Sequence, residues 1–315
     1  MTGRAADDRT RHLRRDNENE KSAPHMSAPR ILIVGATGRI GRVLLRLLRE
    51  DGIGVRALVR TNEGRRDLSA AGVEAVIGDL RDGPALQRVL AGIENVFVVT
   101  RDCPEQADLE AKLFSAAATA GVEHIVKVSA FAAGLDPPVG YGIQHARAEQ
   151  ALRDSGVRWT MLRPYMFMQN FLEMADLIAR RGLIVFPGGT GRVSSIDARD
   201  IAAVARKVLG SPTYFGQIYE LTGPEALGFV DCAAIFTSIL KRRVRYLSVP
   251  DLLSGLLMRA AGISAWDVNM RTQLFRMLRA DGEAGVTRAV QEITGAAPRP
   301  FSAFVQDHVS VFDRP

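Results

Sequence analysis

Six short apolar runs, separated by polar turns and helix-forming segments, set the fold class of this chain. The runs are rich in β-branched residues and apolar on both faces, a pattern typical of strands buried inside a parallel sheet. Parallel neighbours need crossover connections, and right-handed crossovers through helices give a doubly wound α/β sheet. The predicted strands are Ile31–Val34, Val55–Val59, Val73–Ile77, Asn95–Val99, His124–Val128 and Arg158–Leu162. The predicted helices between them lie near residues 39–50, 83–91, 105–120 and 142–155.

The first run ends in a glycine turn that leads directly into the first predicted helix, Gly35-Ala36-Thr37-Gly38-Arg39-Ile40-Gly41. A diphosphate needs close backbone approach, free N–H groups and a helix N-terminus. Gly35 and Gly38 allow that approach, and Gly41 allows the helix to pack on the strand. The spacing is G-x-x-G-x-x-G, yet the strand–turn–helix context is the one that dinucleotide binding requires. A tight turn without a ligand is the alternative.

The end of the second predicted strand distinguishes between the two nicotinamide cofactors. NAD-selective sites place a carboxylate there to bind the ribose 2′-hydroxyl, but this chain reads Leu58-Val59-Arg60-Thr61. The planar guanidinium of Arg60 suits a 2′-phosphate, and Arg39 could join it. NADP(H) is therefore the preferred cofactor, with NAD(H) as the second choice. The alternative is that both are ordinary surface arginines in an arginine-rich chain.

The second half of the chain predicts a smaller unit above the sheet. We predict an NAD(P)-binding Rossmann domain over 30–221 and a mainly helical substrate lobe over 222–315, with contributions from 165–195. The lobe would cover the carboxyl edge, where doubly wound sheets bind ligands. Residues 1–29 are polar and mixed in charge, and we expect a disordered tail or a tag. The later expected elements are a helix at 166–180, a strand near Val193–Ile196, a helix at 198–209, a strand at Gln217–Leu221 and helices at 229–241, 249–262, 266–280, 286–293 and 301–311.

Charge and cysteine content exclude several classes of function. The formal net charge is +6, but the basic residues form no stripe with interleaved aromatics, so no nucleic-acid partner is expected. No apolar run approaches the roughly 18 residues of a membrane span, so no membrane crossing is expected. Cys103 and Cys232 are too few and too far apart for a disulfide framework, which predicts a reducing, cytoplasmic setting. No metal-ligand spacing occurs, and the expected partner is a small-molecule substrate.

Six stretches of the chain resemble the NmrA-like, atypical branch of the short-chain dehydrogenase/reductase superfamily: ILIVGATGRIG, VRALVR, VIGDLRD, IVKVSA, WTMLRPYMFMQNF and ITGAAPRPFSAFVQDH. The likeness covers residues 31–311. That branch includes quinone oxidoreductase- and azoreductase-like enzymes, the isoflavone-reductase group and catalytically silent redox sensors. The resemblance implies that Asp79 and Leu80 lie near the adenine, Thr100 and Arg101 border the nicotinamide, and the turn Pro164-Tyr165-Met166-Phe167 lies beneath it. Without the resemblance, Asp79 could simply cap the following helix.

Four side chains are candidates for proton chemistry beside the cofactor. Ordinary short-chain dehydrogenases place a Ser on the fifth strand and a Tyr-x-x-x-Lys on the next helix, where the lysine lowers the pKa of the tyrosine. Here Ser129 ends the fifth strand and Tyr141 follows it, but His145 stands at the lysine position. Lys127 alternates with Ser129 and is a substitute donor, unless it reaches solvent from the strand end. Tyr141 and His145 are otherwise a helix-start aromatic and a surface histidine.

A methionine-rich apolar run follows the sixth predicted strand, and within it Asn170 and Phe171 are predicted to face the substrate. An amide satisfied by nearby backbone is the alternative for Asn170, and packing in the core is the alternative for Phe171 and the rest of the run. The leading hypothesis is an NADPH-dependent oxidoreductase that transfers hydride to a conjugated carbonyl, quinone, imine or azo compound, since these acceptors need less proton help than a plain ketone. A silent NAD(P)-sensing regulatory protein of the NmrA type is the alternative, and an isomerase or dehydratase is a third. The chain is expected to be a monomer or homodimer.

Overall fold

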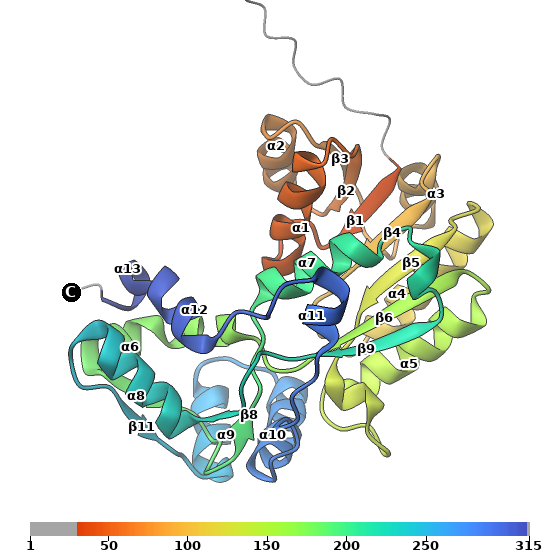
Figure 1. Cartoon of the computed structure of the whole chain (residues 1–315). Helices are drawn as coiled ribbons and strands as arrows, with labels where there is room; N and C mark the ends of the chain where they lie inside the picture. Colours follow the sequence, from red (N-terminus) through yellow and green to blue (C-terminus); the bar gives the residue numbers. More distant parts are fainter. Residues whose placement is uncertain (1–29, 314–315) are drawn as a thin grey trace, which may run out of the picture.

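Seven parallel strands form the central sheet of the computed structural model, which describes residues 30–313. The order β3-β2-β1-β4-β5-β6-β9 places the first strand in the interior and winds outward in both directions (Figure 1). The predicted doubly wound α/β class is therefore confirmed, and the predicted strands of this sheet differ from the observed ones by at most two residues at either end. The tail predicted for 1–29 lies outside the described residues. The sheet strands are β1 (Ile31–Val34), β2 (Val55–Val59), β3 (Glu74–Ile77), β4 (Asn95–Val98), β5 (His124–Val128), β6 (Arg158–Pro164) and β9 (Gln217–Leu221).

Helices cover both faces of the sheet, because successive strand residues point to opposite sides. Ile31 and Ile33 share one core with α1 (Arg39–Glu50) and α7 (Ala198–Val208). Their neighbours Leu32 and Val34 share the other core with α3 (Gly83–Leu90), α4 (Gln106–Thr119) and α5 (Gly142–Asp154). The sequence pattern misses α2 (Asn62–Ala70), because Leu68 is its only buried residue and no apolar stripe marks it.

The lobe is held together by a cluster of phenylalanine rings at the carboxyl edge of the sheet. Phe171, Phe236 and Phe301 lie within 6 Å of one another by ring centroids, and each is almost completely buried. The lobe consists of η2 (Met168–Met174), α6 (Ala175–Arg181), β7 (Leu183–Val185), β8 (Arg192–Val193), β10 (Leu227–Gly228), α8 (Phe229–Leu240), β11 (Arg245–Leu247), α9 (Asp251–Ala260), α10 (Ala265–Arg279), α12 (Phe301–Asp307) and α13 (Val309–Phe312). Figure 1 shows these elements below the sheet.

Three details differ from the sequence-based expectation. The helix expected at 166–180 is a 3-10 helix, η2, that continues as the short helix α6. The strand expected at Val193–Ile196 contracts to β8, which pairs with β10, and β7 pairs with β11 in a second small ribbon. The helix α11 (Ala289–Thr294) falls inside the predicted lobe, but it packs on α7 through Val290 and Ile293. It therefore belongs to the core that the sheet shares with α1 and α7.

Within residues 30–313 no helix has the length and apolar character that a membrane span requires. The same residues contain no cluster of three or more His, Cys, Asp or Glu side chains that could hold a metal ion.

Candidate active site

The glycine turn lies where β1 meets α1, at the carboxyl edge of the sheet. Gly35 has a φ of +88°, and a Cβ there would lie 2.2 Å from the carbonyl oxygen of Val99. A Cβ on Gly41 would lie 2.2 Å from the carbonyl oxygen of Gly35. The turn therefore packs too closely on the end of β4 for a side chain at Gly35, and α1 packs too closely on the turn for a side chain at Gly41. At Gly38, by contrast, a Cβ would meet only the Gly35 oxygen, at 3.2 Å. A side chain at Gly38 therefore needs the Gly35 carbonyl to shift by only a few tenths of an ångström, so packing constrains this position much less than the other two.

The N-terminus of α1 fits an anion. Gly38 is its N-cap and offers no side-chain acceptor to the first-turn N–H groups, and the first turn carries no acidic residue. Thr37, Gly38 and Arg39 are exposed, whereas Ala36 and Ile40 are buried and hold the turn in the core. The positive end of the helix dipole therefore faces outward at the position where the sequence predicts a diphosphate.

Arg60 stands beside this turn, directly after β2. It is exposed and has no hydrogen-bond or ion-pair partner among residues 30–313. The next residue, Thr61, caps α2 by accepting a hydrogen bond from the Gly64 N–H at 3.1 Å. A Cβ on Gly64 would lie 3.6 Å from the Thr37 methyl group, so α2 begins next to the glycine turn. The guanidinium of Arg60 is thus available to a phosphate group near the turn.

Arg39 does not join Arg60 but points toward the lobe. Its guanidinium donates to Asn170 Oδ1 at 3.2 Å and to Glu173 Oε1 at 3.1 Å, both on η2. The structure thus gives Arg39 a role in joining the glycine turn to the lobe. It also places Asn170 at this junction, with its amide oxygen facing the glycine turn. Phe171, the other predicted substrate residue, is 1% exposed inside the aromatic core, so that prediction is wrong.

A buried polar cluster lies behind the loop that follows β4. Lys127 Nζ donates to Glu110 Oε2 at 2.5 Å, and both side chains are fully buried. Thr100 Oγ1 donates to the other oxygen of Glu110, Oε1, at 2.5 Å. Gln106 Nε2 donates to Thr100 Oγ1 and to Glu110 Oε1, both at 3.2 Å. Burial on its own raises the pKa of the Glu110 carboxyl, but Lys127, together with His145 and Thr100, outweighs it and holds the pKa below its usual range. Glu110 is therefore ionised at neutral pH.

His145 connects this cluster to the surface. Lys127 Nζ lies 3.3 Å from His145 Nδ1, and Asp102 Oδ1 lies 3.2 Å from His145 Nε2. An ammonium can only donate, so Nδ1 accepts and Nε2 carries the proton that is donated to Asp102. The Asp102 side chain is 40% exposed, whereas His145 is buried. The expectations of a solvent-seeking lysine and a surface histidine are both wrong, because each side chain finds charged or polar partners inside.

Sequence reasoning missed Asp102, Gln106 and Glu110. Gln106 and Glu110 are one turn apart on α4 and fall on its buried stripe, among Ala107, Leu113 and Phe114. Polar residues on an otherwise apolar stripe were the available signal, since such residues need internal partners. The partner that Glu110 required was the lysine at the end of the neighbouring strand.

Ser129 belongs to a second buried set. Its hydroxyl donates to Glu149 Oε1 at 2.6 Å, and Arg163 binds both oxygens of Glu149, at 2.9 and 2.6 Å. Burial raises the pKa of Glu149, but the hydrogen bonds from Arg163 and Ser129 outweigh it and keep the carboxyl ionised. The proton of the Ser129 hydroxyl is therefore already committed to a carboxylate. Lys127 and Ser129 do point to the same face, toward successive turns of α5.

Tyr141 is held by the lobe. Its hydroxyl donates to Asp267 Oδ1 at 3.0 Å and accepts from Arg271 Nε at 3.2 Å, and its ring lies 5.5 Å from that of Trp266. Burial, only partly offset by Arg271, raises the pKa of the phenol to about 12. Ser129 and His145 have different partners from Tyr141, so the hydrogen bonds of the described chain do not bring these three candidates together.

The turn after β6 is fixed by a carboxyl group from the lobe. Met166 N donates to Glu283 Oε2 at 2.8 Å, and Ile196 N donates to the carbonyl oxygen of Met166 at 2.9 Å. The buried Tyr165 ring packs on Phe131 at 4.3 Å between centroids. The turn from Pro164 to Phe167 is therefore rigidly held at the carboxyl edge of β6, beside the ends of β4 and β5 that carry Thr100 and Ser129.

Glu283 makes stability fall as the pH rises. Burial raises its pKa to about 7, with a smaller opposing effect of the Met166 N–H. An acid with a raised folded-state pKa contributes its full stability below its unfolded pKa and loses it as the pH passes through about 7. We expect Glu283→Gln, which keeps an acceptor for Met166, to be more stable than the wild type at pH 8 by about 3 kcal/mol and equal to it near pH 4. Urea unfolding at both pH values measures this, and equal stability at pH 8 would contradict it.

Asp79 and Leu80 follow β3 at one edge of the site. Asp79 accepts from the Arg81 N–H at 2.9 Å, and it is Asp82 that caps α3 by accepting from the Ala85 N–H at 3.2 Å. The alternative role of Asp79 as the helix cap is therefore wrong. Leu80 is buried.

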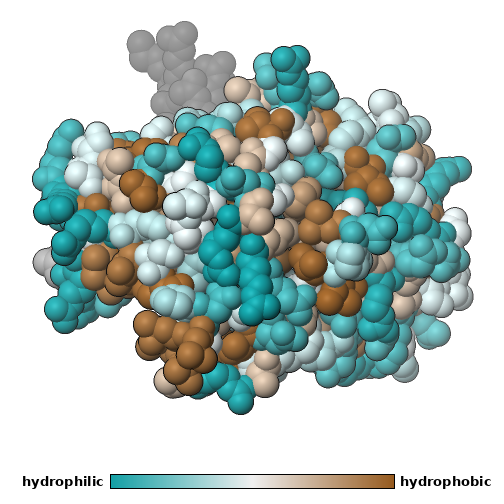
Figure 2. Space-filling model, turned by 90° about the horizontal axis from the view of Figure 1, so that it is seen from below, coloured by the Kyte–Doolittle hydropathy of each residue, from teal (hydrophilic) through white to brown (hydrophobic). Residues whose placement is uncertain are grey.

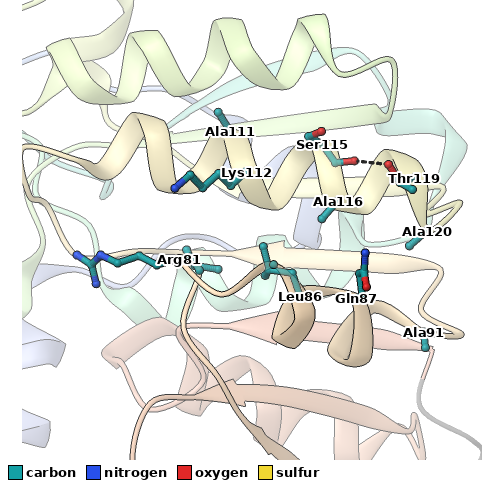
Figure 3. Close-up of a pocket in the computed structure, with 12 residues that line it drawn as sticks. Arg81, Leu86, Gln87, Ala91, Ala111, Lys112, Ser115, Ala116, Thr119 and Ala120 are labelled. Atoms are coloured by element: carbon teal, nitrogen blue, oxygen red, sulfur yellow. Dashed lines mark hydrogen bonds between the residues drawn. The ribbon is translucent and has the colours of Figure 1, made fainter.

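A hollow of about 830 Å³ begins beside Leu80 and runs between α3 and α4, away from the buried cluster (Figure 3). Small side chains on α4 leave this space open, with Arg81 and Lys112 at one end. It lies outside the set of residues that surround the glycine turn and the ends of β4 to β6.

Known proteins resemble this chain in sequence and in fold. The profile of the NmrA-like family matches residues 27–302. An NAD(P)H azoreductase of Xenophilus azovorans is 39% identical over 282 residues, which cover 90% of this chain and 99% of the relative. A (4-alkanoyl-5-oxo-2,5-dihydrofuran-3-yl)methyl phosphate reductase of Streptomyces griseus is 36% identical over 90% of this chain and 99% of its own. Among solved structures, an NADPH-dependent quinone oxidoreductase of Escherichia coli, complexed with NADPH, superposes with a TM-score of 0.80 at 25% identity, covering 89% and 99% of the two chains.

Proposed function

The chain belongs to the NmrA-like family and is an NAD(P)H-dependent oxidoreductase that uses NADP(H), and we propose that its acceptors are conjugated: quinones, azo compounds, imines or enones. The azoreductase relative supports the azo part of this proposal by its name. The physical support comes from the chain's own side chains at the carboxyl edge, where every candidate proton donor already has an internal partner.

The residues present fit the cofactor. The first-turn N–H groups of α1 would hold the diphosphate, since Gly38 leaves them open, and Arg60 would bind the 2′-phosphate. Thr100, Arg101 and the turn from Pro164 to Phe167 would border the nicotinamide, and Asp79 and Leu80 the adenine. Bound NADPH supplies the hydride.

The acid–base equipment of the site favours acceptors that need little help from a protein acid. Ser129 is committed to Glu149, Lys127 to Glu110, and Tyr141 to Asp267, with a phenol pKa raised to about 12. A plain ketone needs a donor at its oxygen as the hydride arrives. A quinone or azo group instead spreads the incoming charge over its conjugated system and can take its proton afterwards from water. This commitment of all three donors is the observation that carries the proposal.

His145 and Asp102 offer one route for that proton from solvent. The exposed carboxylate of Asp102 accepts from His145 Nε2, while Lys127 holds the opposite ring nitrogen and so fixes the tautomer. In this proposal His145 and Lys127 position Asp102, which is the member of the network with access to water.

A panel of acceptors tests the proposal. NADPH oxidation should be fast with soluble quinones, azo dyes, cyclic iminium ions or enones, in at least one of these classes, and undetectable with unconjugated ketones. Turnover of simple ketones at similar rates would overturn the proposed acceptor class. NADPH binding without oxidation by any acceptor would instead favour the silent NAD(P)-sensing regulator.

Removal of the Ser129 or the Tyr141 hydroxyl should have small effects on turnover. We expect Ser129→Ala and Tyr141→Phe each to lower kcat/KM with the preferred acceptor by less than about 10-fold, which is below the roughly 100-fold or more that a general acid contributes. Steady-state kinetics at pH 7 measures both values. Tyr141→Phe keeps the aromatic ring that packs on Trp266, so it removes the hydroxyl alone. A loss of several hundredfold in either variant would identify that hydroxyl as the proton donor.

Arg60 should set the cofactor preference. We expect Arg60→Gln to weaken NADPH binding by about 10-fold, the effect of one lost charge-assisted phosphate contact, and to leave NADH binding unchanged. Calorimetric titration with both cofactors measures the two affinities. Arg88→Gln, an exposed arginine at the end of α3, is the matched control. Equal loss for both cofactors would show that Arg60 does not recognise the 2′-phosphate.

A further inference from the structure

Helix α9 carries its apolar face on the outside of the lobe. Leu252, Leu253, Leu256 and Leu257 are 78%, 46%, 61% and 53% exposed. The opposite side of the helix faces the protein through Ser254, which is buried, through the partly buried Met258, and through Gly255, where a Cβ would lie 3.7 Å from Val268 on α10. Amphipathic helices of monomers show the reverse arrangement, with the apolar stripe turned inward. Figure 2, which views the lobe from below, shows brown residues gathered on this face.

The size of this leucine face is what an interaction surface requires. Four leucines exposed to this extent present roughly 400 Å² of apolar surface, at the size where exposed patches mark interaction sites. Two copies that bury this face against each other would remove about 800 Å² of leucine surface alone. That is about two thirds of the roughly 1,200 Å² at which specific protein–protein interfaces begin, so the residues around the rim have to supply the remaining third.

We propose that α9 is the contact helix of a two-fold homodimer, in which the leucine face of one copy packs against the same face of the other. A two-fold contact needs one self-complementary patch, and a continuous apolar face meets that need without any charge pairing. The helix of 10 residues is about 15 Å long, so an antiparallel pair of α9 helices brings all four leucines of each copy into the contact.

The charges around the face favour a second copy over a lipid surface. Helices that lie on membranes carry several lysines or arginines along their polar flank. On α9 the only basic residue is Arg259, and the nearest arginines of α10, Arg276 and Arg279, are already bound to Asp251. The border of the leucine face is therefore close to electrically neutral. A protein contact can form without charge, whereas binding to a membrane surface is strengthened by basic residues that attract anionic headgroups.

Light scattering coupled to size-exclusion chromatography tests the proposal. The purified chain should show twice its mass of 34.3 kDa at micromolar concentration. Leu252→Gln combined with Leu256→Gln should shift the midpoint of dissociation to at least 10-fold higher protein concentration, without loss of NADPH oxidation. Val230→Gln changes an equally exposed apolar residue on α8, outside the face, and should leave the dimer intact.

A cysteine placed in the face gives a second, independent readout. In a Cys103→Ser background, Leu256→Cys should form an intermolecular disulfide on mild oxidation, because the two-fold contact brings equivalent positions of α9 together. A wild-type chain that is monomeric at all concentrations would overturn the proposal. So would a dimer that the leucine substitutions do not weaken, or a monomer that binds neutral or anionic vesicles through the same leucines.

Discussion

Gly38→Asp is expected to weaken NADPH binding by at least 100-fold while making the folded protein slightly more stable. Gly38 is the N-cap of α1, and its φ of −78° and ψ of 176° are suitable for any residue. Aspartate is among the best N-cap residues and its charge opposes the helix dipole favourably, so α1 should gain about 0.5–1 kcal/mol. The same carboxylate stands where the diphosphate of the cofactor would lie and repels it. A substitution that raises the free energy of unfolding but lowers the affinity for NADPH indicates that the glycine serves cofactor binding and not folding.

Gly38→Ser separates charge from size in this experiment. Serine also caps the helix but carries no charge, so its affinity for NADPH should lie between that of the wild type and that of Gly38→Asp. Calorimetric titration gives the affinities, and thermal unfolding without cofactor gives the stabilities. If Gly38→Asp binds NADPH as the wild type does, the N-terminus of α1 does not hold the diphosphate.

Lys127→Met is expected to destabilise the protein by about 3–5 kcal/mol, because it leaves the buried Glu110 carboxylate without its cation. The loss should shrink on acidification, since Glu110 in the variant can then be protonated. The wild type should depend on pH in the opposite direction and become less stable on acidification. The lowered pKa of Glu110 gives stability that is present above its usual pKa and is lost as the pH falls. Urea unfolding between pH 3 and 8 measures both slopes, because the wild-type loss lies below the ordinary carboxyl pKa of 4.5.

Glu110→Gln is the control for this prediction. Added to Lys127→Met, it removes the unpaired charge and keeps an acceptor for the Thr100 hydroxyl, so the double variant should be more stable than Lys127→Met alone. If Lys127→Met costs less than about 1 kcal/mol, the value typical of an exposed ion pair, then Lys127 is not buried with Glu110.

The sequence predicts the sheet and the glycine turn well because both are encoded locally. Ile31–Val34 can only be a buried strand, and a strand followed by G-x-x-G-x-x-G leads into a helix. Local pattern fails at α2, where Leu68 is the one apolar anchor. It fails again for the strand expected at Val193–Ile196, whose pairing with β10 depends on a segment more than thirty residues away.

The environment of the candidate side chains could not be predicted from neighbours in the sequence. Lys127 was predicted to be a substitute proton donor or to reach solvent, and its burial with Glu110 was missed because Glu110 comes from a helix that packs on the strand only in the folded protein. Tyr141 sits one turn before His145, yet its hydroxyl is held by Asp267 and Arg271, more than 120 residues along the chain. Phe171 was predicted to line a pocket because its run is apolar. A residue of the aromatic core also lies in an apolar run, so the sequence does not distinguish the two positions.

Rapid mixing of the NADPH-loaded protein with an excess of a soluble quinone or azo dye tests the central claim most directly. The nicotinamide absorbance should decay in a single turnover, with one acceptor reduced for each NADPH consumed, and should decay more slowly when the cofactor carries deuterium at the transferred position. Bound NADPH that stays reduced in the presence of every conjugated acceptor would contradict the claim that this chain is a hydride-transferring reductase of such compounds.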